Sequence, residues 1–100
     1  MKLTNKSTDW TSFHDVKFTT TVNELIRVLG EPQEENNTGE DKVNFCWDCE
    51  TEEGKVVTIY DWKEYRIINP DEKIEFHFGS KSRIDSITAK QELRDLIFNK

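Results

Sequence analysis

Glycine and histidine are scarce in this chain of 100 residues, with four and two copies, and their scarcity restricts the chemistry that the chain can support. The sequence has no glycine-rich phosphate loop, no GxSxG, no HExxH and no acidic metal-binding loop. Catalysis requires a nucleophile, an orienting base and groups that stabilise developing charge, and no such set is recognisable. We therefore expect a binding protein that is not an enzyme and that uses no cofactor.

Long apolar runs are missing too. No stretch approaches the roughly 18 apolar residues that a membrane-spanning helix needs, and the N-terminal segment lacks the apolar centre of a signal peptide. We expect no membrane association and a cytoplasmic location. In a reducing compartment the two cysteines, Cys46 and Cys49, would be kept as thiols.

The charge of the chain is uneven. The formal net charge is −6, and the segment from residue 31 to residue 53 holds nine acidic residues and one lysine, a net of −8. Such a surface repels nucleic-acid phosphates and attracts basic protein surfaces, although acidic runs also serve solubility alone. The candidate partner-binding residues in this segment are Glu31, Glu34, Glu35, Glu40, Asp41, Glu52 and Glu53. They predict a protein partner with a basic surface and no direct contact with nucleic acid.

The length predicts one domain over residues 1–100. Hydrophobic residues make up only 34% of the chain, so we expect a thin core built largely on aromatic side chains. Residues 1–12 are mostly polar and predict a loosely ordered N-terminal arm, in which Leu3 and Trp10 are the sizeable apolar anchors.

The first two regular elements are an edge strand and a helix. Residues 13–18 are typical of a short edge strand, although the alternation of their apolar side chains is broken by one position. Thr21 and Glu24 fit the capping box that begins a helix, and apolar residues follow at helical spacing. Gly30 and Pro32 predict the end of this helix.

A β-hairpin follows a solvent-exposed loop that we expect over residues 33–41. Residues 42–50 alternate between apolar and polar side chains, which is typical of a strand with one buried face. The connection over residues 51–54 ends in Gly54, which tolerates positive φ, and residues 55–62 form the partner strand.

The last elements are a third strand and a second helix. Residues 73–78 alternate again, and Ser80 or Ser82 would cap the helix that follows. The expected apolar stripe of that helix comprises Ile84, Ile87, Leu93, Leu96 and Ile97. The predicted fold class is α+β: an antiparallel sheet of three or four strands, arranged as a meander, with two helices packed on one face. The other face of the sheet would stay partly open.

The cysteines form a CxxC motif at Cys46 and Cys49, and with His14 and His77 they supply the residue types of a Cys2His2 zinc site. Strand parity opposes such a site. Residues three apart on a regular strand point to opposite faces, so the two thiols cannot share one ion or form a disulfide. We expect no metal site, with Cys49 on the buried face and Cys46 on the other.

Aromatic and basic residues are concentrated shortly after the hairpin, and they indicate a second way of binding. The candidate ligand-binding residues are Tyr60, Trp62, Lys63, Tyr65, Arg66 and His77. Aromatic rings stack on flat ligands, and basic side chains contact phosphates. This set predicts a binder that sequesters a small nucleotide signal, unless the rings pack in the core and the bases are ordinary surface residues.

The sequences TIYDWK at residues 58–63 and FHFGS at residues 76–80 resemble a pattern in small uncharacterised bacteriophage proteins. The likeness runs from about residue 22 to residue 80, and the pattern has Trp and Gly where this chain has Phe76 and Ser80. The resemblance carries no catalytic activity with it. It implies a mobile-element origin, in which small acidic domains commonly inhibit host systems.

Charge and resemblance together predict a non-enzymatic inhibitor or adaptor of viral type in the host-cell cytoplasm. Its partner would be a host protein with a basic surface, such as a nucleic-acid-handling defence nuclease, in the manner of an anti-CRISPR protein. The alternative is the small-molecule binder that sequesters a nucleotide immune signal.

Overall fold

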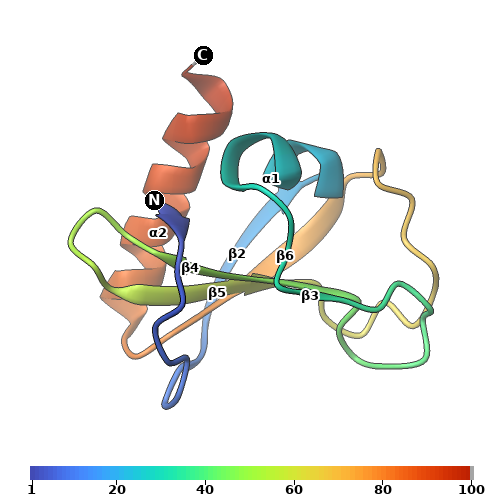
Figure 1. Cartoon of the computed structure of the whole chain (residues 1–100), viewed down its shortest axis with the longest axis horizontal. Helices are drawn as coiled ribbons and strands as arrows, with labels where there is room; N and C mark the ends of the chain where they lie inside the picture. Colours follow the sequence, from blue (N-terminus) through green and yellow to red (C-terminus); the bar gives the residue numbers. More distant parts are fainter. Residues whose placement is uncertain (100) are drawn as a thin grey trace.

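The computed structural model describes residues 1–99, which form an antiparallel sheet and two helices (Figure 1). The elements in chain order are β1 (Lys2–Leu3), β2 (Ser12–Thr20), α1 (Val22–Leu29), β3 (Glu34–Glu35), β4 (Phe45–Glu50), β5 (Val56–Tyr60), β6 (Ile74–Ser80) and α2 (Arg83–Phe98). The sheet has six strands in the order β1-β4-β5-β6-β2, and β3 also pairs with β4. The α+β class and the β4-β5-β6 meander are therefore correct, while the sheet has more strands than the three or four predicted.

The hydrophobic core lies against one face of the sheet. Trp47, Ile59 and Phe78 are register partners on β4, β5 and β6, and all three are 0% exposed. The helices complete this core with Leu25 of α1 and Leu93 of α2, which are buried with them. Because side chains alternate along a strand, the residues next to these core positions point to the opposite face.

The helices begin where the sequence predicts. The Thr21 hydroxyl accepts the backbone N–H of Glu24 at 3.0 Å at the start of α1, and the Ser82 hydroxyl caps α2. The backbone N–H of Gly30 donates to the carbonyl of Ile26 at 2.9 Å and ends α1. α2 packs against β2, β5 and β6, and α1 contacts α2. That both helices pack on one face stays a prediction.

The buried face of α2 differs from the predicted stripe. Ile84 and Ile87 are 65% and 43% exposed. The buried residues of α2 are Ser86, Ala89, Leu93 and Ile97. The small side chains of the first two allow the start of the helix to approach the sheet closely, and the hydroxyls of Ser86 and Ser80 are hydrogen-bonded at 2.5 Å. A prediction of the buried face of α2 from hydrophobicity alone does not detect this polar contact between Ser86 and Ser80.

The N-terminal arm predicted over residues 1–12 is not loose throughout. β1 pairs with the end of β4, where Leu3 lies opposite Cys49, and Leu3 packs against the core. Trp10, in contrast, is 89% exposed and anchors nothing. A two-residue strand has no periodicity to detect; its place depends on the unpaired backbone groups along the edge of β4.

The segment predicted as a loop over residues 33–41 contains a second short strand. In β3, Glu34 lies opposite Cys46 and Glu35 lies opposite Phe45, with both glutamate side chains exposed. β1 and β3 therefore occupy the two halves of the same edge of β4.

The hairpin is confirmed, with shorter strands than predicted. Gly54 has φ of 82° in its turn, as its position predicts. β4 begins at Phe45 and not at residue 42, because the backbone N–H groups of Asn44 and Phe45 donate to the carboxylate of Asp61. That side chain replaces a strand partner at this point.

The predicted edge strand is also confirmed, as β2 beside β6. Its register shifts between Phe13 and Lys17, and Asp15 has φ of 62°. This bulge accounts for the broken alternation in the sequence.

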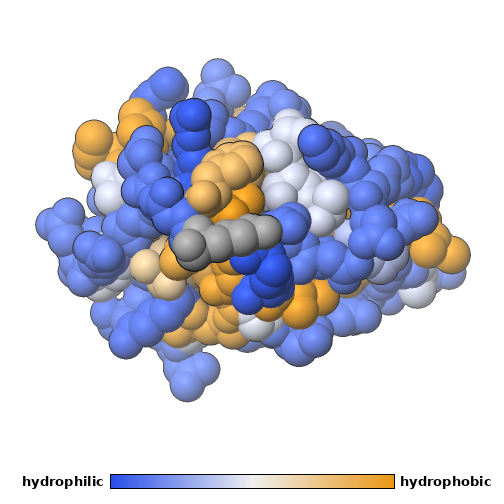
Figure 2. All heavy atoms as spheres, turned by 90° about the horizontal axis from the view of Figure 1, so that it is seen from above, coloured by the Kyte–Doolittle hydropathy of each residue, from blue (hydrophilic) through white to orange (hydrophobic). Residues whose placement is uncertain are grey.

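Several large apolar side chains remain on the surface. Viewed with the C-terminal end of α2 towards the reader, apolar areas appear between hydrophilic ones (Figure 2). The most exposed large apolar residues are Trp10, Phe98, Ile67, Ile84 and Tyr65. Single exposed apolar side chains are common on folded proteins, so a binding surface has to be identified from side chains that contact one another.

Candidate functional site

The face of the sheet opposite the core carries a continuous row of polar and aromatic side chains. The row is defined by strand register: Glu34 pairs with Cys46, Cys46 with Tyr60, Tyr60 with His77, and His77 with Lys17. Register partners on adjacent strands point to the same face. We call this surface the aromatic face; it spans the sheet from the acidic strand β3 to the edge strand β2.

Four rings gather at the centre of the aromatic face, and we call them the aromatic cluster: Phe13, Tyr60, Trp62 and His77. The Phe13 ring stacks on His77 with centroids 4.4 Å apart, and Tyr60 lies 5.8 Å from His77. Trp62 lies 6.1 Å from Tyr60 and 6.4 Å from His77. Phe13 is 40% exposed and Trp62 is 38% exposed, so both present ring surface to a partner.

The bulge in β2 positions Phe13. Phe13 lies opposite Gly79, and Lys17 lies opposite His77. Three residues of β2 lie between these two pairs, but only one residue of β6 does. The extra residues of β2 form a bulge that shifts the register, and the backbone of Asp15 has a positive φ within this bulge. The ring of Phe13 thereby comes beside His77.

Three lysines surround the cluster. The backbone N–H of Lys63 donates to the carbonyl of Lys42 at 2.7 Å, which joins the loops on either side of the hairpin. The ammonium groups of Lys63 and Lys42 then lie 5.6 Å and 5.9 Å from the centre of the Trp62 ring. Lys17 is 6.0 Å from the centre of the Phe13 ring. These separations suit cation–π attraction.

A buried polar network holds the same loops together. Asp61 is 0% exposed, and its carboxylate accepts the N–H groups of Asn44 at 2.9 Å and Phe45 at 2.7 Å. The side-chain amide of Asn44 donates to the Asn37 side-chain oxygen at 2.8 Å, and that oxygen also accepts the N–H of Ile68. Burial raises the pKa of Asp61, while the backbone N–H donors lower it.

Three titratable groups at the centre of the aromatic face, Cys46, Tyr60 and His77, favour their uncharged forms. Burial lowers the pKa of His77, and the nearby Lys17 lowers it further. Burial also raises the pKa of the Cys46 thiol, and the carboxylate of Asp48 adds to this shift. Burial raises the pKa of Tyr60 as well. The centre of the face is therefore aromatic and neutral, and its charges lie at the rim.

The structure brings together four of the six candidate ligand-binding residues. Tyr60, Trp62, Lys63 and His77 belong to the aromatic face. Arg66 does not, because its guanidinium group is paired with Glu72 at 2.7 Å and with Glu64 at 3.1 Å.

The sixth candidate, Tyr65, is 54% exposed and has φ of 52°. It makes none of the ring contacts that define the cluster among the described residues.

Sequence reasoning missed three contributors to this surface, namely Phe13, Lys17 and Lys42. The broken alternation near Phe13 was the available signal, since a bulge redirects side chains. Lys42 is the one base within the acidic segment, but its position beside Trp62 depends on the pairing of two loops.

The seven candidate acids are all exposed, and they do not form one surface. Glu34 and Glu35 lie on β3 beside the start of β4, and Glu31, Glu40 and Asp41 lie in the flanking segments. Glu52 and Glu53 lie in the turn beyond the other end of β4. Six residues of extended chain span about 20 Å, which is more than twice the screening length of about 8 Å at physiological salt. The acidic segment therefore supplies two separate charged surfaces.

The two cysteines are free, and the prediction that they point to opposite faces is confirmed. Cys49 is 0% exposed in the core, whereas Cys46 belongs to the aromatic face. Burial raises the pKa of Cys49 to about 12. Among residues 1–99, no three His, Cys, Asp or Glu side chains gather as a metal site would require.

Comparison with known proteins adds no further assignment. No protein-family model, curated protein or solved structure matches this chain. Within residues 1–99, neither helix is long and apolar enough to span a membrane.

Proposed function

We propose that this protein is a non-enzymatic inhibitor or adaptor of the kind made by bacteriophages, and that it binds a basic surface of a host protein. The observation that carries the proposal is the row from Glu34 through Cys46 and Tyr60 to His77. It places an exposed acid of β3 on the same face as the aromatic cluster. Acidic and aromatic side chains thus form one surface.

The composition of that surface favours a protein partner. Tyr and Trp are enriched among the residues that contribute most to protein binding, and they usually lie inside a rim of charged groups. Here Trp62 and Phe13 are partly exposed near the centre, with Glu34 at one end of the row and Lys17 at the other. Its complement is a surface that is apolar opposite the rings and basic opposite Glu34, and the nucleic-acid channel of a defence nuclease supplies such basic residues.

Two double charge reversals test which acids bind. Glu34→Lys with Glu35→Lys reverses the charge of β3, and Glu52→Lys with Glu53→Lys makes the same change at the other end of β4. Immobilised wild-type protein and both variants are exposed to bacterial host lysate, and captured proteins are quantified by mass spectrometry. We expect the β3 variant to lose a captured partner at least tenfold, and the turn variant to keep it within about twofold.

The contribution of the rings is tested by Trp62→Ala, which should also lose that partner. Raising the salt concentration should weaken capture, because exposed charges are screened. Circular dichroism confirms that each variant is folded. A partner retained equally by all variants, or lost only with the turn variant, contradicts the proposal.

A second candidate function rests on the lysines beside Trp62. The ammonium groups of Lys42 and Lys63 both lie within 6 Å of the ring centre, so a base stacked on the indole would place its phosphate near two cations. This arrangement supports a binder that sequesters a nucleotide immune signal. Calorimetric titration of the protein with cyclic nucleotides and NAD distinguishes the two functions. Micromolar binding that Lys42→Gln with Lys63→Gln abolishes favours the nucleotide.

A further inference from the structure

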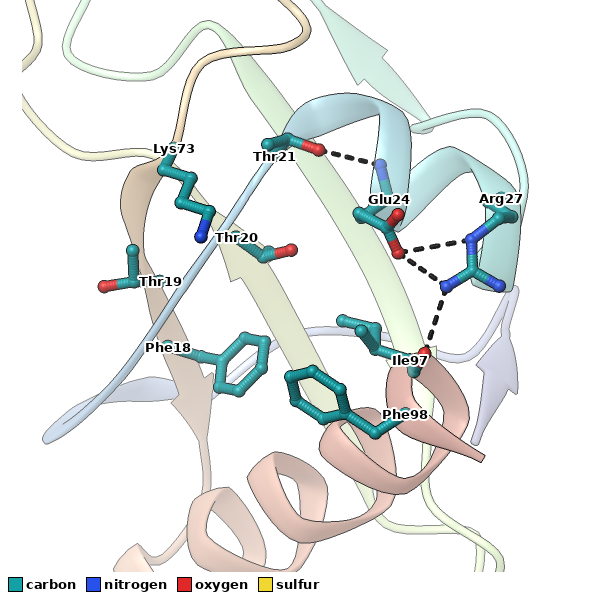
Figure 3. Close-up of a pocket in the computed structure, with 9 residues that line it drawn as sticks. All are labelled: Phe18, Thr19, Thr20, Thr21, Glu24, Arg27, Lys73, Ile97 and Phe98. Atoms are coloured by element: carbon teal, nitrogen blue, oxygen red, sulfur yellow. Dashed lines mark hydrogen bonds and ion pairs between the residues drawn. The ribbon is translucent and has the colours of Figure 1, made fainter. Parts of the chain in front are cut away.

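A cleft opens where the end of β2, the start of α1 and the end of α2 meet (Figure 3). Its volume is about 330 Å³, which is within the range of small-molecule sites. It lies apart from the aromatic cluster, and none of its lining residues belongs to that cluster. Ligand binding in this cleft would therefore be independent of the proposed function of the aromatic face.

One wall of the cleft is apolar. The rings of Phe18 and Phe98 lie side by side along it, with Ile97 next to them (Figure 3). Phe98 is 70% exposed in the ligand-free chain. Burial of an exposed aromatic ring is favourable, and a flat apolar group placed against these two rings would bury both.

The opposite wall carries one cation without a partner. Lys73 forms no ion pair or hydrogen bond with the other described residues. Arg27, in contrast, donates from Nε to the carboxylate of Glu24 at 3.2 Å and from Nη2 to the carbonyl of Ile97 at 3.2 Å. The described lining residues that carry charge are Glu24, Arg27 and Lys73, so their formal charges sum to +1. The cleft suits a ligand with a single negative charge.

A hydroxyl in the wall of the cleft also forms no hydrogen bond within the described residues. Thr20 is 6% exposed, and its side chain makes no hydrogen bond to another described residue, whereas the neighbouring Thr21 hydroxyl accepts the N–H of Glu24 at 3.0 Å. Figure 3 shows the Thr20 oxygen directed into the open space on the side of Glu24. The Thr20 oxygen remains accessible from the cleft, where a ligand oxygen would accept a hydrogen bond from it.

We propose that this cleft binds a small aromatic monocarboxylate. The carboxylate accepts hydrogen bonds from the Lys73 ammonium and the Thr20 hydroxyl, and the aromatic ring packs against Phe18 and Phe98. The lone cation fixes the charge of the ligand, and the volume restricts it to about one ring with a short side chain.

Titration of the full chain with phenylacetate, monitored by two-dimensional 1H–15N NMR, tests the site. We expect saturable shifts for the amides of residues 18–21 and 97–98, with a dissociation constant on the order of 1 mM or tighter. Phenylacetamide, which has the same ring without the charge, should bind at least tenfold more weakly, and acetate, which has the charge without the ring, likewise.

Three variants assign the contacts. Lys73→Gln should weaken phenylacetate binding at least tenfold, whereas Lys90→Gln, which removes an exposed charge elsewhere on α2, should leave it unchanged. Thr20→Val keeps the side-chain shape without the hydroxyl, so it should weaken binding several-fold in a folded protein. Phe98→Ala removes ring contact from an exposed position and should weaken binding as well.

Three results overturn the proposal: no saturable shift at about 20 mM phenylacetate, equal affinity for acetate and phenylacetate, or equal losses in Lys73→Gln and Lys90→Gln. The last two would mark weak, unspecific attraction of anions. Protein capture by the aromatic face is measured separately, so either proposal can fail while the other stands.

Discussion

The Phe13 ring stacks on the imidazole of His77 at a centroid distance of 4.4 Å and an interplanar angle of 21°. Phe13 belongs to the edge strand β2 and His77 to the central meander, so this contact joins the bulged edge to the middle of the aromatic face. It also covers part of the imidazole, and such burial disfavours the charged form of histidine.

Acidification should destabilise the protein through His77. Its folded-state pKa lies below the reference value of 6.5, so between the two pKa values the unfolded chain binds more protons. Stability therefore rises with pH in that window, and it is lost as the pH falls from about 6.5 through the folded-state pKa. We expect the melting temperature of the wild type to fall more between about pH 7.5 and about pH 5.5 than that of His77→Gln.

The two proteins differ only at residue 77, so the comparison isolates the contribution of His77. Equal losses in the wild type and in His77→Gln would show that His77 does not contribute to the pH dependence.

The elements that could be predicted from the sequence are those with several periods of a local pattern. The hairpin has clear alternation and a turn glycine, and α1 has a capping threonine with a terminating Gly30, so each was found close to its true bounds. β1 and β3 have two residues each. No pattern fits in two residues, and such strands form only because an adjacent edge needs hydrogen-bond partners.

The face of α2 was mispredicted for a related reason. Ile84 is more hydrophobic than Ser86, yet Ser86 is buried against Ser80 of β6. Helix orientation is set by packing and by buried polar contacts, which composition does not report.

The candidate site was predictable in its central residues but not at its rim. Tyr60 and His77 could be placed on one face by strand parity, but the loop pairing of Lys63 with Lys42 and the ion pairing of Arg66 are tertiary contacts. The acidic segment was continuous in sequence, and the length of β4 divides it in space.

Serine substitutions at the two cysteines should have unequal effects. Cys49→Ser places a hydroxyl in the core, where Cys49 is 0% exposed, and should lower the free energy of unfolding by about 1–3 kcal/mol. Cys46→Ser changes a partly exposed side chain on the aromatic face and should cost less than about 0.5 kcal/mol. Urea unfolding of both variants gives the ranking. The opposite order would contradict the register of β4.

Removing the carboxylate of Asp61 should destabilise the start of β4. Asp61→Ala leaves the buried N–H groups of Asn44 and Phe45 without their acceptor, and we expect a loss of about 2–5 kcal/mol. Asp61→Asn keeps one acceptor oxygen and should lose less. Asp9→Ala, at an exposed position, is the control and should stay within about 0.5 kcal/mol of the wild type in urea unfolding. A small loss in Asp61→Ala would mean that water can replace the carboxylate.

The close approach of the strands at Gly79 should make this position intolerant of a methyl group. A Cβ there would lie 2.5 Å from Oγ1 of Thr58 and 3.4 Å from the edge of the Tyr60 ring. We expect Gly79→Ala to lower the free energy of unfolding by about 1–3 kcal/mol. Thr58→Ala removes the obstructing oxygen, so Gly79→Ala should cost at least about 1 kcal/mol less in that background. Urea unfolding of the wild type, both single variants and the double variant measures this coupling. An equal cost in the two backgrounds would show that the oxygen of Thr58 is not what excludes a side chain at Gly79.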